Sequence, residues 1–164
     1  PEIRKYVAQA FCTIIKTEHP GVQSISGVAT GGIAQAALIA EQMSLPMTYV
    51  RSSAKGHGRQ NQVEGVVNKG ENTVVIEDLI STGGSSLIGV EALRNADANV
   101  QGLIAIFTYG FQKSIDSFNK VNTPFTTLTN YSILIEEAEK MGYVDADAIA
   151  SLEEWRKAPD KWQG

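Results

Sequence analysis

The sequence predicts an α/β fold, an open and mostly parallel twisted sheet flanked by helices on both faces. Three observations predict it. Apolar, strand-like runs alternate with helical stretches along the chain. Two of the junctions between a strand and the following helix are glycine-rich turns. The composition, 164 residues with 43% hydrophobic and 20% charged side chains, is that of a globular domain, and we expect residues 1–164 to form a single domain.

Hydrophobic periodicity places the individual elements. Apolar side chains recur at three- and four-residue spacing in the opening helix, and apolar runs with turn signals mark the strands. In the first half we predict a helix over 2–16, a strand over 22–28, a glycine turn over 29–32, a helix over 33–43 and a strand over 47–50. In the second half we predict strands over 73–76, 102–108 and 125–128, and helices ending near 95, over 113–120, over 131–141 and over 145–157.

The charge and the cysteine content exclude several classes of protein. The net charge of −4 and the lack of a basic tract argue against a nucleic-acid partner, because neutralising phosphates needs clustered Lys and Arg. A single cysteine, Cys12, excludes an internal disulfide and a multi-cysteine zinc site, and we expect it in the core. No apolar run is long enough to span a membrane. A cytoplasmic protein is expected.

A polar segment over 51–62, RSSAKGHGRQNQ, follows the second predicted strand. Its only apolar side chain is one alanine, and it carries three basic residues and one histidine. Such a segment cannot offset its ordering entropy by burial, so we predict an exposed loop or lid. The structural alternative is a solvated surface turn.

A second glycine-rich turn, rich in hydroxyls, follows the strand predicted over 73–76. Backbone N–H groups and hydroxyls at a helix start bind phosphate through hydrogen bonds and the helix dipole. Glu77 and Asp78 lie just before the turn, where two carboxylates suit the hydroxyls of a sugar whose phosphate lies in the turn. The residues of this phosphate cradle are Ser81, Thr82, Gly83, Gly84 and Ser85. Alternatively, Ser81 or Thr82 only caps the helix.

Three segments are expected to share one edge of the sheet. In open parallel sheets, ligands bind outside the carboxyl ends of the strands. The turn at Thr30–Gly32, the basic segment 51–62 and the segment 77–85 each follow a predicted strand. The cradle at residues 81–85 has the size for a monophosphate, and the chain has neither a P-loop motif nor a dinucleotide-binding fingerprint.

These segments carry a resemblance to a known family. Residues 74–85 resemble the phosphoribosyl-diphosphate signature of type I phosphoribosyltransferases, and residues 27–32 resemble the loop that contacts diphosphate in that family. Arg51 together with Lys55-Gly56-His57-Gly58 resembles the catalytic loop R-x-x-x-K-x-H-G of the orotate phosphoribosyltransferases. The last pattern distinguishes orotate enzymes from purine enzymes.

The resemblance implies an activity and a set of site residues. The family transfers the phosphoribosyl group from phosphoribosyl diphosphate to orotate, which gives orotidine 5′-monophosphate in pyrimidine biosynthesis. The implied catalytic residues are Lys55, His57, Arg51 and Asp78. The implied substrate-binding residues are Thr30, Gly31, Gly32, Glu77, Asp78, Ser81, Thr82, Gly83, Gly84 and Ser85.

The resemblance also implies a cofactor and an assembly. Mg²⁺ is expected to bind through the diphosphate and the ribose hydroxyls of the substrate, with no direct side-chain ligand. A homodimer is expected, in which the 51–62 loop acts in trans on the site of the neighbouring chain.

Three features depart from the family pattern. Ser52 stands where many orotate enzymes have a second lysine. Tyr109 stands where many have an arginine that faces the orotate carboxylate; it is either a hydrogen-bonding ligand or an aromatic cap on the sheet edge. The chain starts at Pro1, and we expect the family's N-terminal segment to be missing or trimmed. A purine phosphoribosyltransferase and a non-catalytic sensor of phosphoribosyl diphosphate stay open as other functions.

Overall fold

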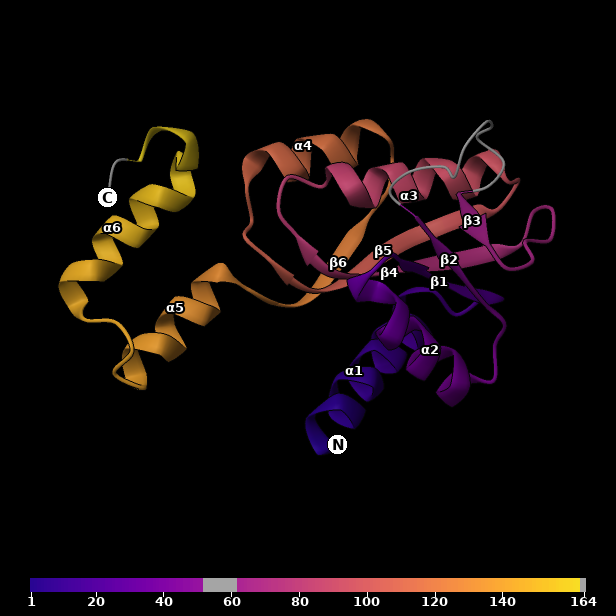
Figure 1. Ribbon diagram of the computed structural model, residues 1–164, viewed down its shortest axis with the longest axis horizontal. Helices are drawn as coiled ribbons and strands as arrows, with labels where there is room; N and C mark the ends of the chain where they lie inside the picture. The colour runs from indigo at the N-terminus through magenta and orange to yellow at the C-terminus, as the bar shows by residue number, and fades with distance from the viewer. Residues whose placement is uncertain (52–61, 163–164) are drawn as a thin grey trace.

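The structure, a computed structural model, describes residues 1–51 and 62–162. Six strands form one sheet in the order β3-β2-β1-β4-β5-β6 (Figure 1). All neighbouring strands are parallel except β2 and β3. The strands are β1 (Ser24–Val28), β2 (Met47–Val50), β3 (Val63–Glu64), β4 (Asn72–Ile80), β5 (Asn99–Thr108) and β6 (Phe125–Asn130). The predicted α/β fold is confirmed.

Helices cover both faces of the sheet. In Figure 1, α3 and α4 lie above the sheet, and α1 and α2 lie below it. The helices are α1 (Glu2–Glu18), α2 (Gly31–Met43), α3 (Gly84–Asn95), α4 (Gln112–Lys120), α5 (Tyr131–Lys140) and α6 (Ala146–Lys157), followed by a short 3-10 helix (Pro159–Lys161). No helix within the described part of the chain is both long and apolar enough to cross a membrane.

Two apolar clusters hold the layers together, one on each face. The cluster on the face covered by α1 and α2 includes Ala8, Phe11, Cys12, Ile15, Ile25, Ile39, Val74, Ile76 and Ile104. The cluster on the face covered by α3 and α4 includes Val28, Val50, Val75, Ile80, Leu93, Leu103, Ala105 and Phe118. The spacing of the apolar residues predicts the buried side of α1 in part: Phe11 and Ile15 are buried, whereas Ile3 and Tyr6 are exposed. Cys12 lies in the core as expected.

The central strand β4 is longer than the sequence predicts. The predicted strand stops at residue 76, before the two acids, but β4 continues to Ile80. Its pairing with β5 explains the difference, since Glu77 pairs with Ala105 and Ile80 with Thr108 in a parallel ladder. The two acids therefore belong to the strand and not to the turn after it. The two-residue strand β3 was not predicted.

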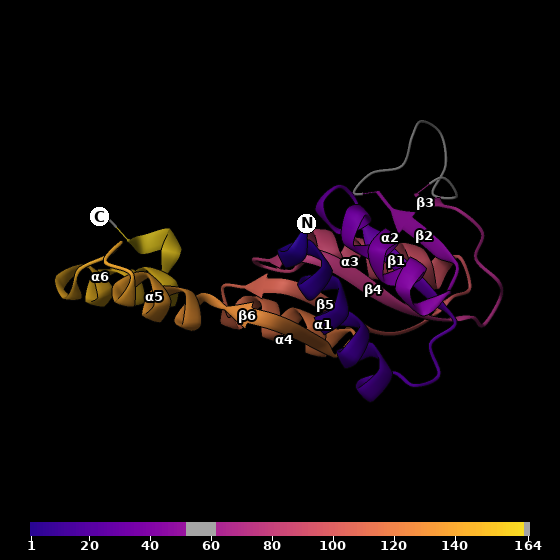
Figure 2. The ribbon, with the colours of Figure 1, turned by 90° about the horizontal axis from the view of Figure 1, so that it is seen from below.

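The C-terminal helices α5 and α6 project beyond one end of the sheet (Figures 1 and 2). Their starts are capped by side chains: Asn130 accepts a hydrogen bond from the Ile133 N–H at 3.1 Å, and Asp145 accepts one from the Ala148 N–H at 2.8 Å. Aromatic rings join α6 to the loop after β5. The Tyr109 ring stacks on Phe111 at 5.3 Å and meets the Trp155 ring edge-on at 5.5 Å. The aromatic-cap interpretation of Tyr109 fits these contacts.

Candidate active site

Two predicted segments meet at the carboxyl edge of β1 and β4. The Ala29 N–H donates to the Val50 carbonyl at 2.8 Å, so the turn after β1 starts beside the end of β2. The turn then passes against β4: a Cβ atom added to Gly31 would lie 1.8 Å from Oδ2 of Asp78. A side chain at residue 31 would therefore displace the Asp78 carboxylate from this position. The structure therefore brings together Asp78 and the turn predicted to bind diphosphate.

The two adjacent acids of β4 point to opposite faces of the sheet. Successive side chains of a strand alternate between faces. Asp78 shares a face with Ile76 and lies at the start of α2, where its side chain is exposed. Glu77 shares a face with Val75, on the side of α3, and is 4% exposed. Of these two acids, Asp78 is therefore the one that presents its carboxylate to solvent at this edge.

Glu77 is a buried acid with two hydrogen-bond donors. Oε2 accepts a hydrogen bond from the Ser86 hydroxyl at 2.9 Å, and Oε1 accepts one from the Asp78 N–H at 3.1 Å. Burial raises the pKa of Glu77 to about 7, and the neighbouring Asp78 adds to the rise, while the hydrogen bond from Ser86 opposes it. Protonated and ionised forms of Glu77 are thus both populated near neutral pH.

This raised pKa predicts a pH-dependent stability. The folded chain binds a proton at Glu77 more tightly than the unfolded chain, whose carboxyl titrates near 4.5. Stability is therefore lost as the pH rises through the interval from about 4.5 to about 7. Glu77→Gln should abolish this loss, on the order of 2 kcal/mol after allowing for solvent screening. Denaturant unfolding at acidic and at mildly alkaline pH measures it. Glu91→Gln, an exposed change on α3, is the control, and equal pH dependence in Glu77→Gln and the unmodified chain would contradict the assignment.

The phosphate cradle lies at the start of α3. The helix begins at Gly84, and its N-cap is Gly83, which has a φ of 84° and no side chain to act as a cap. A Cβ atom at Gly83 would also lie 2.8 Å from the Phe118 ring. Neither Ser81 nor Thr82 is the N-cap, so the capping alternative is wrong. The N–H groups of the first helical turn remain oriented toward the carboxyl edge, as phosphate binding requires.

The basic segment is anchored at both ends beside the first turn. Strands β2 and β3 pair antiparallel, with Val50 opposite Val63, and the Arg51 N–H donates to the Gln62 carbonyl at 2.9 Å. The Arg51 guanidinium forms an ion pair with the Glu64 carboxylate, so part of its charge is already matched. Lys55 and His57 lie outside the described residues. The anchor points nonetheless fix where the segment leaves and re-enters the sheet.

The sequence did not indicate two features next to the cradle. One is Ser86, whose hydroxyl binds Glu77 from the first turn of α3. The other is a cavity of about 260 Å³ beside Thr82, which is also lined by Lys113 of α4 and by Arg156 and Lys157 of α6. These cations come from distant parts of the chain, and no local pattern connects them to the cradle. The sequence carries no local signal for the bond between Ser86 and Glu77, because the two residues are nine positions apart on different elements.

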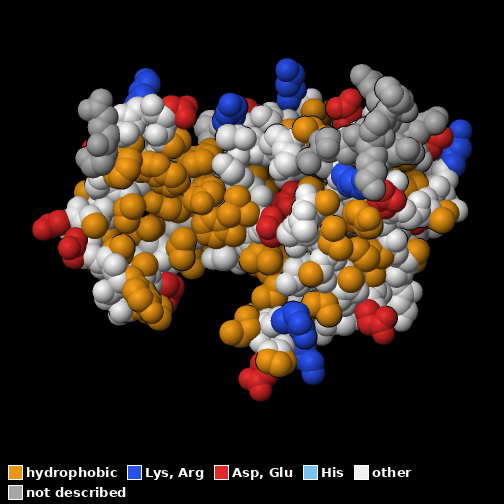
Figure 3. Space-filling model, in the orientation of Figure 1, with side chains coloured by type: hydrophobic (Ala, Val, Ile, Leu, Met, Phe, Trp, Pro, Cys, Tyr) orange, Lys and Arg blue, Asp and Glu red, His pale blue; other side chains and the backbone are white. Residues whose placement is uncertain are grey.

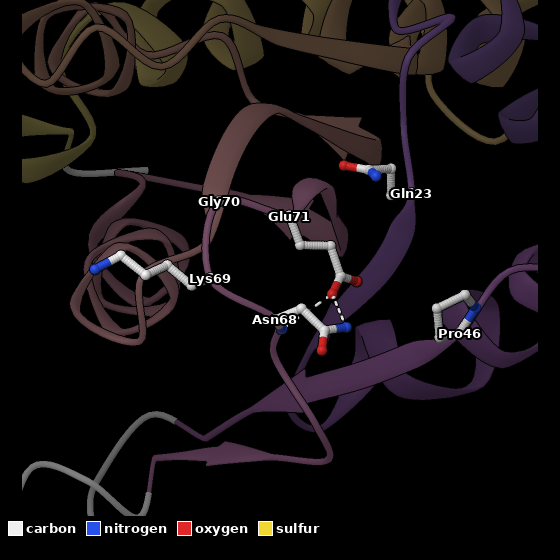
Figure 4. Close-up of a pocket in the computed structure, with 6 residues that line it drawn as sticks. All are labelled: Gln23, Pro46, Asn68, Lys69, Gly70 and Glu71. Atoms are coloured by element: carbon white, nitrogen blue, oxygen red, sulfur yellow. Dashed lines mark hydrogen bonds between the residues drawn. The ribbon is translucent and has the colours of Figure 1, made fainter.

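A larger cavity, of about 330 Å³, lies at the amino ends of the strands (Figure 4). Neither Glu77 nor Asp78 lines it. Glu71 lines it, and Oε2 of Glu71 accepts hydrogen bonds from the backbone N–H and the side-chain amide of Asn68 at 3.0 and 2.6 Å. Burial raises the pKa of Glu71, but hydrogen bonds from Ser24 and Asn68 outweigh that effect and hold it below its usual value. This carboxylate is satisfied within the fold and stabilises the turn before β4.

Comparisons with known proteins agree with the geometry. A family model described as the phosphoribosyl transferase domain matches residues 2–138. The orotate phosphoribosyltransferase of Staphylococcus haemolyticus is 51% identical over 156 residues, which are 95% of this chain and 77% of that protein.

Two solved structures, one of an orotate enzyme and one of an adenine enzyme, are similar in fold to this chain. The crystal structure of orotate phosphoribosyltransferase from Aeropyrum pernix superposes with a TM-score of 0.74 at 28% identity, covering 88% of this chain and 80% of that one. Adenine phosphoribosyltransferase from Leishmania donovani superposes with a TM-score of 0.65 at 21% identity, covering 79% of this chain and 65% of that one, and shares the fold alone. On the strength of the family model and the close orotate relatives, the chain belongs to the orotate phosphoribosyltransferase family.

Proposed function

We propose that this chain transfers the 5-phosphoribosyl group from phosphoribosyl diphosphate to orotate, in the pyrimidine pathway. The orotate ring nitrogen forms a bond to C1 of the ribose while the bond from C1 to the diphosphate oxygen breaks. The products are orotidine 5′-monophosphate and diphosphate. The observation that carries the proposal is the close approach of Gly31 to Asp78 on β4, together with the phosphate cradle that comes after the end of β4. One edge thereby offers groups for a sugar, a phosphate and a diphosphate.

The residue roles follow from charge and exposure. We assign the ribose hydroxyls to Asp78, the exposed member of the acid pair. Residues 81–85 are assigned to the 5′-phosphate and Thr30–Gly32 to the diphosphate, because each is a turn that opens a helix. Lys55 and His57, with Arg51, are assigned to the leaving group. Catalysis is then mainly positioning and charge neutralisation.

We also propose that the substrate brings Mg²⁺ to the site. Among the described residues, no group of three or more His, Cys, Asp or Glu side chains lies close enough together to hold a metal ion. The exposed carboxylate of Asp78 is a hard oxygen donor beside the diphosphate turn, which fits an ion held chiefly by substrate oxygens. When bound, Mg²⁺ would neutralise part of the diphosphate charge. Asp78 would orient the ribose hydroxyls beside it.

A direct assay tests the reaction. The chain is mixed with orotate, phosphoribosyl diphosphate and Mg²⁺, and the loss of orotate absorbance is followed. Turnover of orotate supports the proposal. Turnover of adenine, guanine or hypoxanthine without turnover of orotate would replace it with a purine enzyme. Binding of phosphoribosyl diphosphate in calorimetry with no turnover of any base would favour the sensor.

Asp78→Asn should weaken sugar binding. The amide keeps the size of the side chain but loses the charge that accepts hydrogen bonds from two hydroxyls, and a hydrogen bond to a charged group contributes about 1.5–3 kcal/mol. We expect the Kd for ribose 5-phosphate to rise by about tenfold or more. Calorimetry at fixed pH measures it. Asp97→Asn, an exposed change at the other edge, is the control, and an unchanged Kd in Asp78→Asn would contradict the ribose assignment.

We propose a homodimer in which the 51–62 loop acts on the neighbouring site. Large apolar side chains are exposed on α1 and α5, and Figure 3 shows apolar surface on both parts of the molecule. They are Ile3, Tyr6, Ile133 and Leu134. Exposed apolar surface of this kind is typical of protein interfaces. Sedimentation velocity tests the dimer, and a monomer at micromolar concentration would contradict it.

Mixing two impaired variants, assayed at a substrate concentration below the Kd of Asp78→Asn, tests whether the loop acts in trans. Lys55→Ala removes the loop cation, and Asp78→Asn removes the sugar ligand. In a mixed dimer, one site keeps Asp78 and receives Lys55 from its neighbour. Recovery of activity on mixing is therefore expected. If mixed dimers form and activity does not recover, the loop acts on the site of its own chain.

A further inference from the structure

The cavity of about 260 Å³ beside Thr82 gathers positive charge. Three of its lining side chains are cations: Lys113 lies at the start of α4, and Arg156 and Lys157 lie at the end of α6. One lining side chain, Asp160, is an acid. The whole chain has a net charge of −4, so the charge around this cavity is opposite in sign to that of the molecule.

The three cations are not neutralised by the surrounding fold. Within residues 1–51 and 62–162, none of them lies within 4.0 Å of a carboxylate oxygen. The Arg156 guanidinium donates a hydrogen bond to the Ser132 hydroxyl, a neutral partner that leaves the charge unmatched. Lys113 and Lys157 are exposed. The cavity therefore presents positive charge to anions in solution.

Aromatic packing keeps the two sources of this charge together. The ring of Trp155, the residue before Arg156, lies 5.7 Å from the Phe111 ring and 5.3 Å from the Tyr131 ring, between centroids. Phe111 also lines the cavity and is the N-cap of α4. In Figure 1 the end of α6 faces the start of α4. The cations of both helices are thus held around one hollow, where their fields add.

The cavity adjoins the phosphate cradle. Thr82 is a cradle residue and also lines the cavity. It belongs to the turn between the end of β4 at Ile80 and the start of α3 at Gly84. A cleft lined by charge of one sign focuses the field and raises the association rate of ligands of the opposite sign. A phosphate group attracted to this cavity is therefore already beside the N–H groups that are proposed to bind it.

We propose that the cavity is a capture site for phosphate groups, in which Lys113, Arg156 and Lys157 attract the 5′-phosphate of phosphoribosyl diphosphate before it enters the cradle. This inference rests on the proposed function, since it takes residues 81–85 as the 5′-phosphate site. The cations act on the encounter, and the N–H groups of the cradle hold the phosphate afterwards. Phosphate monoesters are the ligand class, because the site recognises their charge.

Removing two of the cations tests the proposal. Lys113→Gln/Lys157→Gln keeps Arg156, whose hydrogen bond to Ser132 joins α6 to α5. The association rate constant of phosphoribosyl diphosphate should fall about tenfold at about 0.02 M salt and less than about twofold at about 0.5 M salt, because salt screens exposed charges. The dissociation rate constant should change by less than about twofold. Stopped-flow tryptophan fluorescence measures both constants, and calorimetry at the two salt concentrations checks their ratio.

Asp160→Asn should have the opposite effect. It removes the acid that lines the cavity, so the association rate constant should rise about two- to threefold at low salt. An unchanged or lower rate constant would contradict the proposal.

The control for total charge is Lys16→Gln/Lys69→Gln. This variant removes the same charge from exposed positions before β1 and β4, at the amino edge of the sheet. The association rate constant should stay within about twofold of that of the unmodified chain. An equal fall in the control and in Lys113→Gln/Lys157→Gln would show an effect of net charge and would overturn the capture site. Faster dissociation of Lys113→Gln/Lys157→Gln at an unchanged association rate would also overturn it, because the lysines would then hold the bound ligand.

The unmodified chain separates this inference from the function on which it rests. If it does not bind phosphoribosyl diphosphate, the proposed function and the inference both fail. If it binds phosphoribosyl diphosphate and Lys113→Gln/Lys157→Gln associates with it equally fast at low salt, the function stands and the capture site alone is overturned.

Discussion

Replacing Lys55 by alanine is expected to lower kcat about 100- to 1000-fold and to change the Kd of phosphoribosyl diphosphate by less than about threefold. Negative charge builds on the departing diphosphate mainly in the transition state, so a cation that meets it there contributes to rate more than to binding. Arg51, at the start of the same segment, is paired with Glu64. We therefore expect Lys55 to supply most of the positive charge that meets the leaving group, since residue 52 is an uncharged serine.

Steady-state kinetics with orotate and calorimetry with phosphoribosyl diphosphate measure the two effects separately. Lys69→Ala is the matched control, because Lys69 is an exposed lysine at the amino edge of the sheet. It should alter neither quantity. Equal losses in kcat and in affinity for Lys55→Ala would instead indicate that this lysine binds substrate and transition state alike.

Gly32→Ala is expected to lower the free energy of unfolding by about 3 kcal/mol, the upper end of the cost of overpacking. A Cβ atom at this position would lie 2.4 Å from the Ile76 carbonyl oxygen and 3.4 Å from Cα of Glu77. Both atoms belong to the backbone of β4, which is held by strands on each side. The clash can be relieved only by moving the turn away from the strand, so diphosphate binding should be lost as well.

Gly31→Ala is the informative comparison. Here the nearest atom is Oδ2 of Asp78, at the free end of a side chain that can rotate away. Stability should change by less than about 1 kcal/mol, while sugar binding falls because the carboxylate is displaced. Denaturant unfolding of both variants, with ribose 5-phosphate calorimetry, checks the pair. A Gly32→Ala chain as stable as the unmodified one would contradict the prediction, because it would mean that the turn moves away from β4 at little cost in free energy.

Local patterns predicted the parts of the site that depend on neighbouring residues. The cradle over 81–85 and the turn at Thr30–Gly32 each combine glycine with a helix start, and both lie where the sequence indicated. The helix α1 was likewise readable from its apolar spacing. In each case the physical cause acts within a few residues, so a single sequence contains it.

Non-local pairing decided the rest. The length of β4 depends on the ladder with β5, and the alternation of a strand then separates Glu77 from Asp78. Two adjacent acids expected to bind one sugar therefore face different layers. The ion pair between Arg51 and Glu64 depends on a strand of two residues, which is too short to leave a signal in the sequence.

The contact between the first turn and β4 makes ligand binding a property of the assembled sheet. Thr30 and Asp78 are 48 positions apart and belong to different strand-helix units, so neither unit can form the proposed site by itself. A ligand that binds the native edge withdraws population from every state in which β1 and β4 are unpaired. Its binding energy therefore reinforces the centre of the molecule and not merely the loops that touch it.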